Sequence, residues 1–157
     1  MVITNVMRTL EKQGLRFTSK EYEYDENDLS GLHAAEALGM PPEQVFKTLV
    51  ARGDKQPYCV FVIPVAEELD LKKCASVSGN KRVELIHVKE LLPLTGYLRG
   101  GCSPIGMKKK LPTYLDETAL LFDVISISAG QRGVQVCVSP NDLTDLIQAK
   151  TGDLIRF

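Results

Sequence analysis

The spacing of hydrophobic residues changes several times along the chain, and each change marks the end of one predicted element. Residues 4–13 carry apolar side chains at helical spacing and are followed by Gly14, which predicts a short amphipathic helix that ends at this glycine. Residues 15–24 alternate between apolar and polar side chains, a pattern typical of a strand with one solvated face. The acidic residues 25–30 are expected to form a loop.

A second helix is predicted between Ser30, whose hydroxyl can cap a helix, and Gly39, which can end one. Leu32, Ala35 and Leu38 fall on one side of this helix and form its expected apolar face. The two prolines that follow favour the start of another helical turn.

Two apolar runs rich in Val, Phe and Ile, residues 45–51 and 58–65, are separated by turn residues, which predicts an antiparallel hairpin. Pro93 is expected to end a helical turn that begins at Val88. The remaining pattern predicts helices and short strands at these positions: helices at residues 67–77 and 141–149, and strands at residues 83–86, 113–115, 124–128 and 133–138.

The order of these elements lacks the regular strand–helix–strand rhythm of a doubly wound sheet. We therefore expect an α+β fold, in which helices surround a curved, barrel-like sheet with antiparallel or mixed pairing. With 157 residues, 44% of them hydrophobic, the chain is long enough for one domain with its own core, and residues 1–157 contain no linker or repeat. No stretch approaches the roughly 18 apolar residues of a membrane helix, so a cytoplasmic protein without membrane contact is expected.

The net charge of −1 hides an uneven distribution of charge along the chain. Residues 1–45 hold four Lys/Arg and eight Asp/Glu, whereas residues 71–110 hold nine Lys/Arg and only Glu84 and Glu90. Such a local excess of positive charge attracts phosphate groups. A solvated basic face is the commoner explanation of such a run, and the sequence leaves both open.

Cysteine and histidine are sparse, which limits the chemistry that the chain can perform. The four cysteines lie far apart and form no CxxC pair, so reduced thiols are expected rather than zinc ligands or disulfides. Only His33 and His87 are present, which leaves little material for a metal site or a histidine-based triad. No metal and no cofactor are therefore expected.

Lys47 stands in VFKTLVA, an apolar stretch of predicted strand. An ammonium group there needs a partner or a function to offset the loss of its hydration. It either contacts a phosphate or hydroxyl of a ligand in a cleft, or carries its charge outward to the solvated side of the strand. Tyr22 and Tyr24 are open to a similar choice, between contact with a nucleotide and burial in the sheet.

Residues 99–106, RGGCSPIG, place three glycines, a serine and a proline in eight positions. Glycine lets backbone N–H groups approach a ligand closely, so this loop could cradle an oxyanion, although a sharp structural turn is the more frequent explanation. The loop matches neither an NTP-binding nor a dinucleotide-binding motif. Cys102 in this loop is a candidate nucleophile, but no base accompanies it in the sequence.

Four segments taken together resemble the YbaK/EbsC family of bacterial aminoacyl-tRNA deacylases: VFKTLVA, PVAEELDLKK, TGYLRGGCSPIGMKKKLPTYLDE and SAGQRG, within residues 7–154. The resemblance implies a single-domain relative of the editing domain that is inserted in bacterial prolyl-tRNA synthetases. It implies hydrolysis of the ester in mischarged Cys-tRNA(Pro), an error that arises because cysteine is close to proline in size. The implied partners are tRNA(Pro) and prolyl-tRNA synthetase.

The resemblance also implies which residues form the site. The essential lysine of the family corresponds to Lys47 and a pocket tyrosine to Tyr22. Gln135 is also expected to bind the substrate, and it stands where some members have an acidic residue, which puts in doubt any role that needs a charge there. The GGxSPxG loop of the family falls on Gly100, Gly101, Ser103, Pro104 and Gly106, the first two implied to be catalytic, and Thr48 and Ser128 are expected to line the same pocket.

In the mechanism that the resemblance implies, the cysteinyl thiol of the substrate attacks its own ester carbonyl. The protein then supplies positioning and an oxyanion-stabilising loop rather than a nucleophile. Two alternatives stay open. One is a deacylase that activates a water molecule and acts on Ala-tRNA(Pro) or another misacylated tRNA. The other is a non-catalytic module that binds tRNA or a synthetase through the basic residues 71–110.

Overall fold

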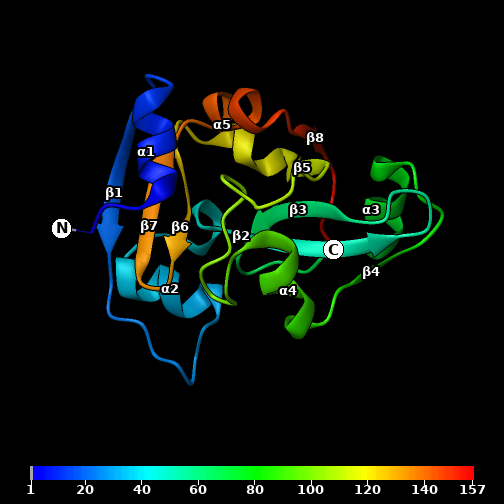
Figure 1. Ribbon diagram of the computed structural model, residues 1–157, viewed down its shortest axis with the longest axis horizontal. Coiled ribbons are helices and arrows are strands. Elements are labelled where there is room, and N and C mark those ends of the chain that lie inside the picture. The colour runs from blue at the N-terminus through cyan, green and yellow to red at the C-terminus, as the bar shows by residue number, and fades with distance from the viewer. Residues whose placement is uncertain (1) are drawn as a thin grey trace.

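The computed structural model describes residues 2–157, which form an α+β fold with two β-sheets (Figure 1). The smaller sheet is antiparallel and has the strand order β1-β7-β6, formed by Phe17–Glu21, Val134–Val138 and Ile125–Gln131. The larger sheet has the order β4-β2-β3-β5-β8, formed by Val83–Leu85, Phe46–Gly53, Cys59–Pro64, Thr113–Asp116 and Lys150–Gly152. Its first three strands pair antiparallel and its last three pair parallel, so the larger sheet is mixed.

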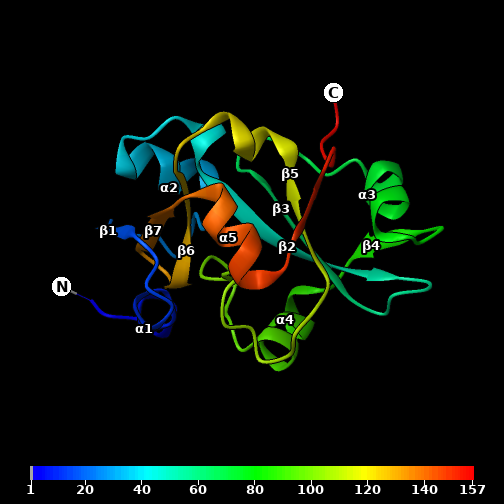
Figure 2. The same ribbon diagram turned by 90° about the horizontal axis from the view of Figure 1, so that it is seen from above.

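Short helices cover the two sheets, and most begin at a polar cap, because a side-chain oxygen there accepts from a backbone N–H that has no partner within the helix. The α-helices are α1 Asn5–Lys12, α2 Gly31–Leu38, α3 Leu71–Ser78, α4 Val88–Thr95 and α5 Pro140–Ile147, and the 3-10 turns are η1 Pro42–Gln44 and η2 Glu117–Leu121. The predicted cap at Ser30 and the predicted stop at Gly39 are both confirmed for α2. Figures 1 and 2 place α1 beside the smaller sheet and α3 near the far end of the larger one.

The predicted hairpin is confirmed and forms the centre of the larger sheet. Its register runs from Phe46 opposite Pro64 to Ala51 opposite Cys59. Successive side chains of β2 point to opposite faces of the sheet. Phe46 and Val50 therefore pack into the apolar cluster that also holds the inner face of β6, whereas Ala51 packs into a second cluster on the other face.

The barrel-like sheet expected from the sequence is not present, because the strands divide between two sheets that do not close on each other. A parallel bridge between Val45 and Ser126 links them beside the start of β2. Strand β8 was not predicted, since its three residues carry no apolar pattern and depend on pairing with β5.

Several predicted helix boundaries and faces also need correction. Helix α3 begins four residues after the predicted start, where Asp70 caps it, and α4 continues past Pro93 to Thr95. Pro93 removes only one backbone donor, and the helix still closes with a hydrogen bond from Gly96 N–H to Leu92 O of 2.8 Å. In α2 the residues buried are Ala34 and Ala35, and Leu32 is half exposed.

Within residues 2–157, every helix is too short or too polar to cross a bilayer.

Candidate active site

A cavity of about 660 Å³ opens along the first half of β2. Strand β4 pairs with β2 only from Ala51 to Gly53, so this edge of β2 is left uncovered by β4. The opposite wall of the cavity is formed by α2, by β6 and β7, and by residues 99–106, which we call the glycine loop. Six of the site residues that the family resemblance implied line this one cavity although they are far apart in the chain: Tyr22, Lys47, Thr48, Gly100, Ser128 and Gln135.

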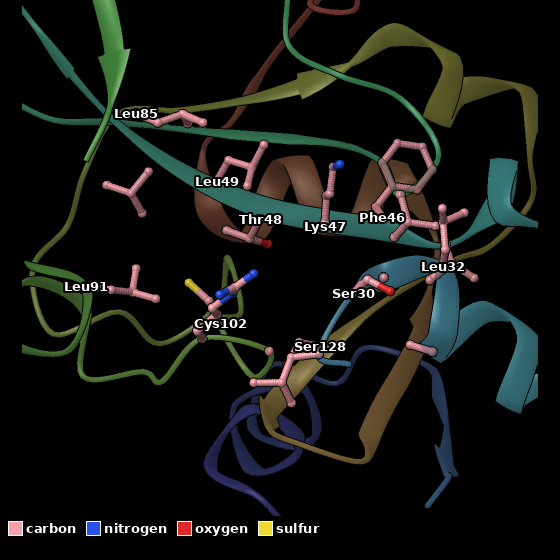
Figure 3. Close-up of a pocket in the computed structure, with 18 of the residues that line it drawn as sticks. Ser30, Leu32, Phe46, Lys47, Thr48, Leu49, Leu85, Leu91, Cys102 and Ser128 are labelled. Atoms are coloured by element: carbon pink, nitrogen blue, oxygen red, sulfur yellow. The ribbon is translucent and has the colours of Figure 1, made fainter. Parts of the chain in front are cut away.

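Lys47 and Thr48 enter this cavity from opposite sides of β2. In Figure 3 the side chain of Lys47 rises from one side of the strand together with Leu49, whereas Thr48 points toward Cys102 and Ser128. The Oγ1 of Thr48 is buried and has no hydrogen-bond partner among residues 2–157. Lys47 therefore lies in the wall of the cavity, but across the strand from the glycine loop.

The ammonium group of Lys47 is half-buried and forms no ion pair within 4 Å in residues 2–157. Burial lowers the pKa of Lys47, because the charged form loses hydration, and the nearby carboxylates of Glu68 and Glu67 partly oppose this effect. A cation without a protein partner at the edge of a cavity is well placed to bind an anionic group of a ligand.

The corner formed by β6 and β7 is polar but carries no charge. Ser126 and Ser128 of β6 and Gln135 of β7 lie on the face of the smaller sheet that is turned away from its apolar core. The Oγ of Ser126 donates to Oε1 of Gln135 over 2.9 Å, and the N–H of Gly130 donates to Oγ of Ser128 over 3.1 Å. This corner is therefore held rigid by hydrogen bonds between neighbouring residues.

The glycine loop contributes less to the cavity than its motif implies. Gly100, at φ 87°, lines the cavity, whereas the N–H of Gly101 donates to the carbonyl of Leu98 over 3.0 Å. That bond occupies the N–H of Gly101, so of the two glycines only Gly100 has an N–H without a partner among residues 2–157. Gly101 instead lies against the β6–β7 turn, where a Cβ atom would come within 3.0 Å of the backbone N of Arg132.

The remaining residues of the GGxSPxG motif do not line the first cavity. Ser103 and Pro104 are buried, and Oγ of Ser103 accepts from Ile105 N–H over 3.3 Å. Gly106 lines a second cavity, of about 490 Å³, together with Tyr97 and Lys108. The structure therefore does not bring these three residues to the lining of the first cavity.

Cys102 lines the first cavity and is the only one of the four cysteines that is not fully buried. Burial nevertheless raises the pKa of its thiol to about 12, with a hydrogen bond to Thr95 acting in the opposite direction. Because the thiolate is the nucleophilic form, this thiol is unreactive near neutral pH. Among residues 2–157 there is no group of three His, Cys, Asp or Glu that could hold a metal ion.

Sequence reasoning missed the apolar end of the cavity. This end is lined by Leu49, Leu85, Val88 and Leu91. The exposed fraction is 50% for Leu85 and 62% for Val88. Arg99 also lines the cavity, although the sequence indicated it only as one of the basic residues of 71–110 and as the first residue of the loop 99–106. Leucines in short amphipathic elements resemble core residues, so only their exposure in the folded chain distinguishes them.

Comparison with known proteins identifies the family to which this chain belongs. The model of the aminoacyl-tRNA editing domain matches residues 31–146. A protein of Enterococcus faecalis named "Putative Cys-tRNA(Pro)/Cys-tRNA(Cys) deacylase EbsC" is 46% identical over 151 residues, which are 96% of this chain and 92% of that protein. The proline–tRNA ligase of Shouchella clausii is 29% identical over 100 residues, which are 64% of this chain and 17% of the ligase.

A solved structure agrees with these relatives. The crystal structure of "a putative trans-editing enzyme for prolyl tRNA synthetase" superposes with a TM-score of 0.82 and 27% identity, covering 99% of this chain and 100% of that chain. The resemblance seen in the four sequence segments is thereby confirmed. Because the family model matches most of the sequence and EbsC aligns along nearly all of it, the chain belongs to the aminoacyl-tRNA editing domain family.

Proposed function

We propose that this protein is a trans-editing deacylase that hydrolyses the ester of mischarged Cys-tRNA(Pro). The observation that carries the proposal is a cavity that combines the cation of Lys47 with a neutral polar corner, in a chain 46% identical to EbsC. A volume of about 660 Å³ is in the range of small-molecule sites and suits an aminoacylated nucleoside.

Lys47 binds the anionic part of this substrate. The 3′ end of tRNA carries a phosphate next to the acylated adenosine, and an ammonium group that has lost part of its hydration interacts strongly with such an anion. Glu67 and Glu68 lie near enough to influence its pKa, but neither forms an ion pair with it within 4 Å. The ammonium group is therefore available to the substrate.

The nucleophile is the thiol of the substrate. Its sulfur attacks the ester carbonyl, so that a C–S bond forms, the C–O bond to the ribose breaks, and the thiol proton ends on the ribose hydroxyl. The product is a cyclic thiolactone, which water opens to cysteine. The raised pKa of Cys102 supports this assignment, because a protonated enzyme thiol competes poorly with a substrate thiol that is held next to the carbonyl. The N–H of Gly100 stabilises the developing oxyanion.

The proposal is tested by deacylation of a set of charged tRNA(Pro) molecules. Cysteinyl-tRNA(Pro) should be hydrolysed, and S-methylcysteinyl-tRNA(Pro), which has a similar shape but no thiol, should not be. Rapid hydrolysis of both S-methylcysteinyl- and alanyl-tRNA(Pro) would instead indicate an activated water. Binding of all three without hydrolysis would indicate a non-catalytic module. Trapping the thiolactone for mass spectrometry identifies the intermediate directly.

Prolyl-tRNA synthetase is the proposed partner, in the cytoplasm where tRNA is charged. The part of the chain that the structure describes, residues 2–157, contains no extended basic arm, and the similarity to part of a proline–tRNA ligase supports a link between the two activities. Sedimentation of the protein with the synthetase and tRNA(Pro) tests this partner. A complex that forms equally well with unrelated synthetases would contradict it.

A further inference from the structure

The hydrogen bond between Ser126 and Gln135 fixes the orientation of one group in the wall of the cavity. Ser126 is fully buried and Gln135 is only 6% exposed. The hydroxyl of Ser126 donates to Oε1 of Gln135 over 2.9 Å. A carboxamide has an acceptor end and a donor end, so holding its oxygen leaves the NH2 group at the other end.

The NH2 group of Gln135 has no hydrogen-bond partner among residues 2–157, and Gln135 lines the cavity. Because Gln135 lines the cavity, an acceptor atom of a ligand can bind this NH2 group, which no protein group occupies. The position therefore favours an acceptor atom and disfavours another donor.

The neighbouring groups make this preference specific. Thr48 and Ser128 present hydroxyl groups on the same side of β2, and no carboxylate accompanies them. The two carboxylates that line the cavity, Glu67 and Glu68, lie with Lys47 instead. An ammonium group placed beside Gln135 would meet a donor and no negative charge, whereas a carbonyl oxygen or a sulfur atom would be bound.

We propose that Ser126 sets the hydrogen-bonding direction of Gln135, so that this corner binds an acceptor atom of the aminoacyl group and turns its α-ammonium group away. Gln135 is then a specificity-determining residue, and Ser126 is a positioning residue that acts through it. This inference rests on the proposed function, because the aminoacyl group is its ligand.

Direct observation of the Gln135 side chain tests the inference independently of turnover. The probe is adenosine that carries cysteine through a 3′-amide, which the protein cannot hydrolyse as an ester. The side-chain NH2 resonances of Gln135, assigned by their loss in Gln135→Glu, should shift when the probe is added. Shifts of backbone resonances around the cavity without a change in these two would overturn the inference and leave the proposed function standing. Absence of any shift, together with absence of deacylation, would overturn both.

Substitutions test the positioning role of Ser126. Ser126→Ala frees the carboxamide to rotate and should lower kcat/KM for cysteinyl-tRNA(Pro) by about tenfold, the effect of one well-placed hydrogen bond. Ser126→Thr keeps the hydroxyl and should restore most of this loss and the shift of the Gln135 resonances. Equal losses in both variants, with unchanged Gln135 resonances, would show that Ser126 acts only through packing.

Gln135→Glu keeps the shape of the side chain and an oxygen for Ser126, but replaces the donor by a carboxylate. We expect kcat/KM to fall by about tenfold or more. Gln13→Glu, at the exposed end of α1, introduces the same charge away from the cavity and should leave kcat/KM unchanged. An unchanged kcat/KM in Gln135→Glu would contradict the proposed donor role.

Discussion

Lys47 and Thr48 are consecutive residues of β2 whose side chains leave the strand on opposite sides, yet both line the same cavity (Figure 3). This is possible because the cavity follows the edge of the strand rather than one face of the sheet. The cation on one side and the hydroxyl on the other can therefore contact different parts of one ligand. We assign the anionic part of the acylated tRNA end to Lys47 and the acyl part to the side of Thr48.

Replacing Lys47 by alanine should lower kcat/KM for cysteinyl-tRNA(Pro) by about a hundredfold, because a charge-assisted contact in a partly dehydrated site is lost. Lys47→Arg keeps the charge and should retain part of the activity. Lys150→Ala removes an exposed lysine of β8 and serves as the control. Steady-state deacylation measures all three variants, and activity of Lys47→Ala equal to that of the control would remove Lys47 from the site.

The activity should fall at alkaline pH as Lys47 loses its proton. Burial lowers the pKa of Lys47, so this loss begins at a lower pH than for an exposed lysine, and the nearby Glu68 raises the same pKa. Glu68→Gln should therefore move the alkaline limb of the pH–rate profile to lower pH. The profile is measured after subtraction of spontaneous ester hydrolysis. A limb that stays in place in Glu68→Gln, as in the surface control Glu23→Gln, would show that another group titrates.

Cys102 should be dispensable for turnover and slow to alkylate. Burial raises the pKa of its thiol to about 12, so near pH 8 almost none of it is thiolate. Cys102→Ser should keep kcat within about threefold of the original, since no covalent step depends on it. Mass spectrometry after iodoacetamide treatment should show modification of Cys102 only over hours, compared with minutes in denaturant. Loss of all turnover in Cys102→Ser would favour an enzyme thiol as nucleophile.

Gly101→Ala should disturb the loop without adding a group to the cavity. The new Cβ would lie 3.0 Å from the backbone N of Arg132 and 3.2 Å from the backbone C of Gln131, neither of which can rotate away. We expect a lower melting temperature and reduced kcat, because Gly100 moves with the loop. Gly14→Ala meets no atom within 4 Å, although its φ is positive, and should affect only stability. Equal activity in both variants would argue against the role of the loop.

Asp116 should be important for stability and not for catalysis. It is fully buried, and its carboxylate accepts from Leu154 N–H over 3.0 Å and from Thr118 N–H over 3.2 Å. Asp116→Ala should lower the free energy of unfolding by about 3 kcal/mol, because these donors lose their acceptor in the interior. Urea unfolding measures the change, with the exposed Asp123→Ala as the control. A loss no larger than that of the control would contradict this role.

Elements whose determinants are local were predictable. The cap at Ser30, the stop at Gly39 and the hairpin of β2 and β3 follow from a few adjacent residues, and the structure contains all of them. Elements that depend on distant partners were not. Strand β8 exists through its pairing with β5, more than thirty positions earlier, which no periodicity indicates.

The candidate site shows the same division. The sequence by itself determined that a lysine lies in an apolar strand and that a glycine loop similar to the GGxSPxG loop of the family is present, because each is a pattern of adjacent residues. Only the tertiary structure decided that Gly101 lies against the β6–β7 turn, that Lys47 and Thr48 line one cavity together with Gly100, and that Ser126 is hydrogen-bonded to Gln135. These are contacts between separate segments, which exist only once the chain has packed.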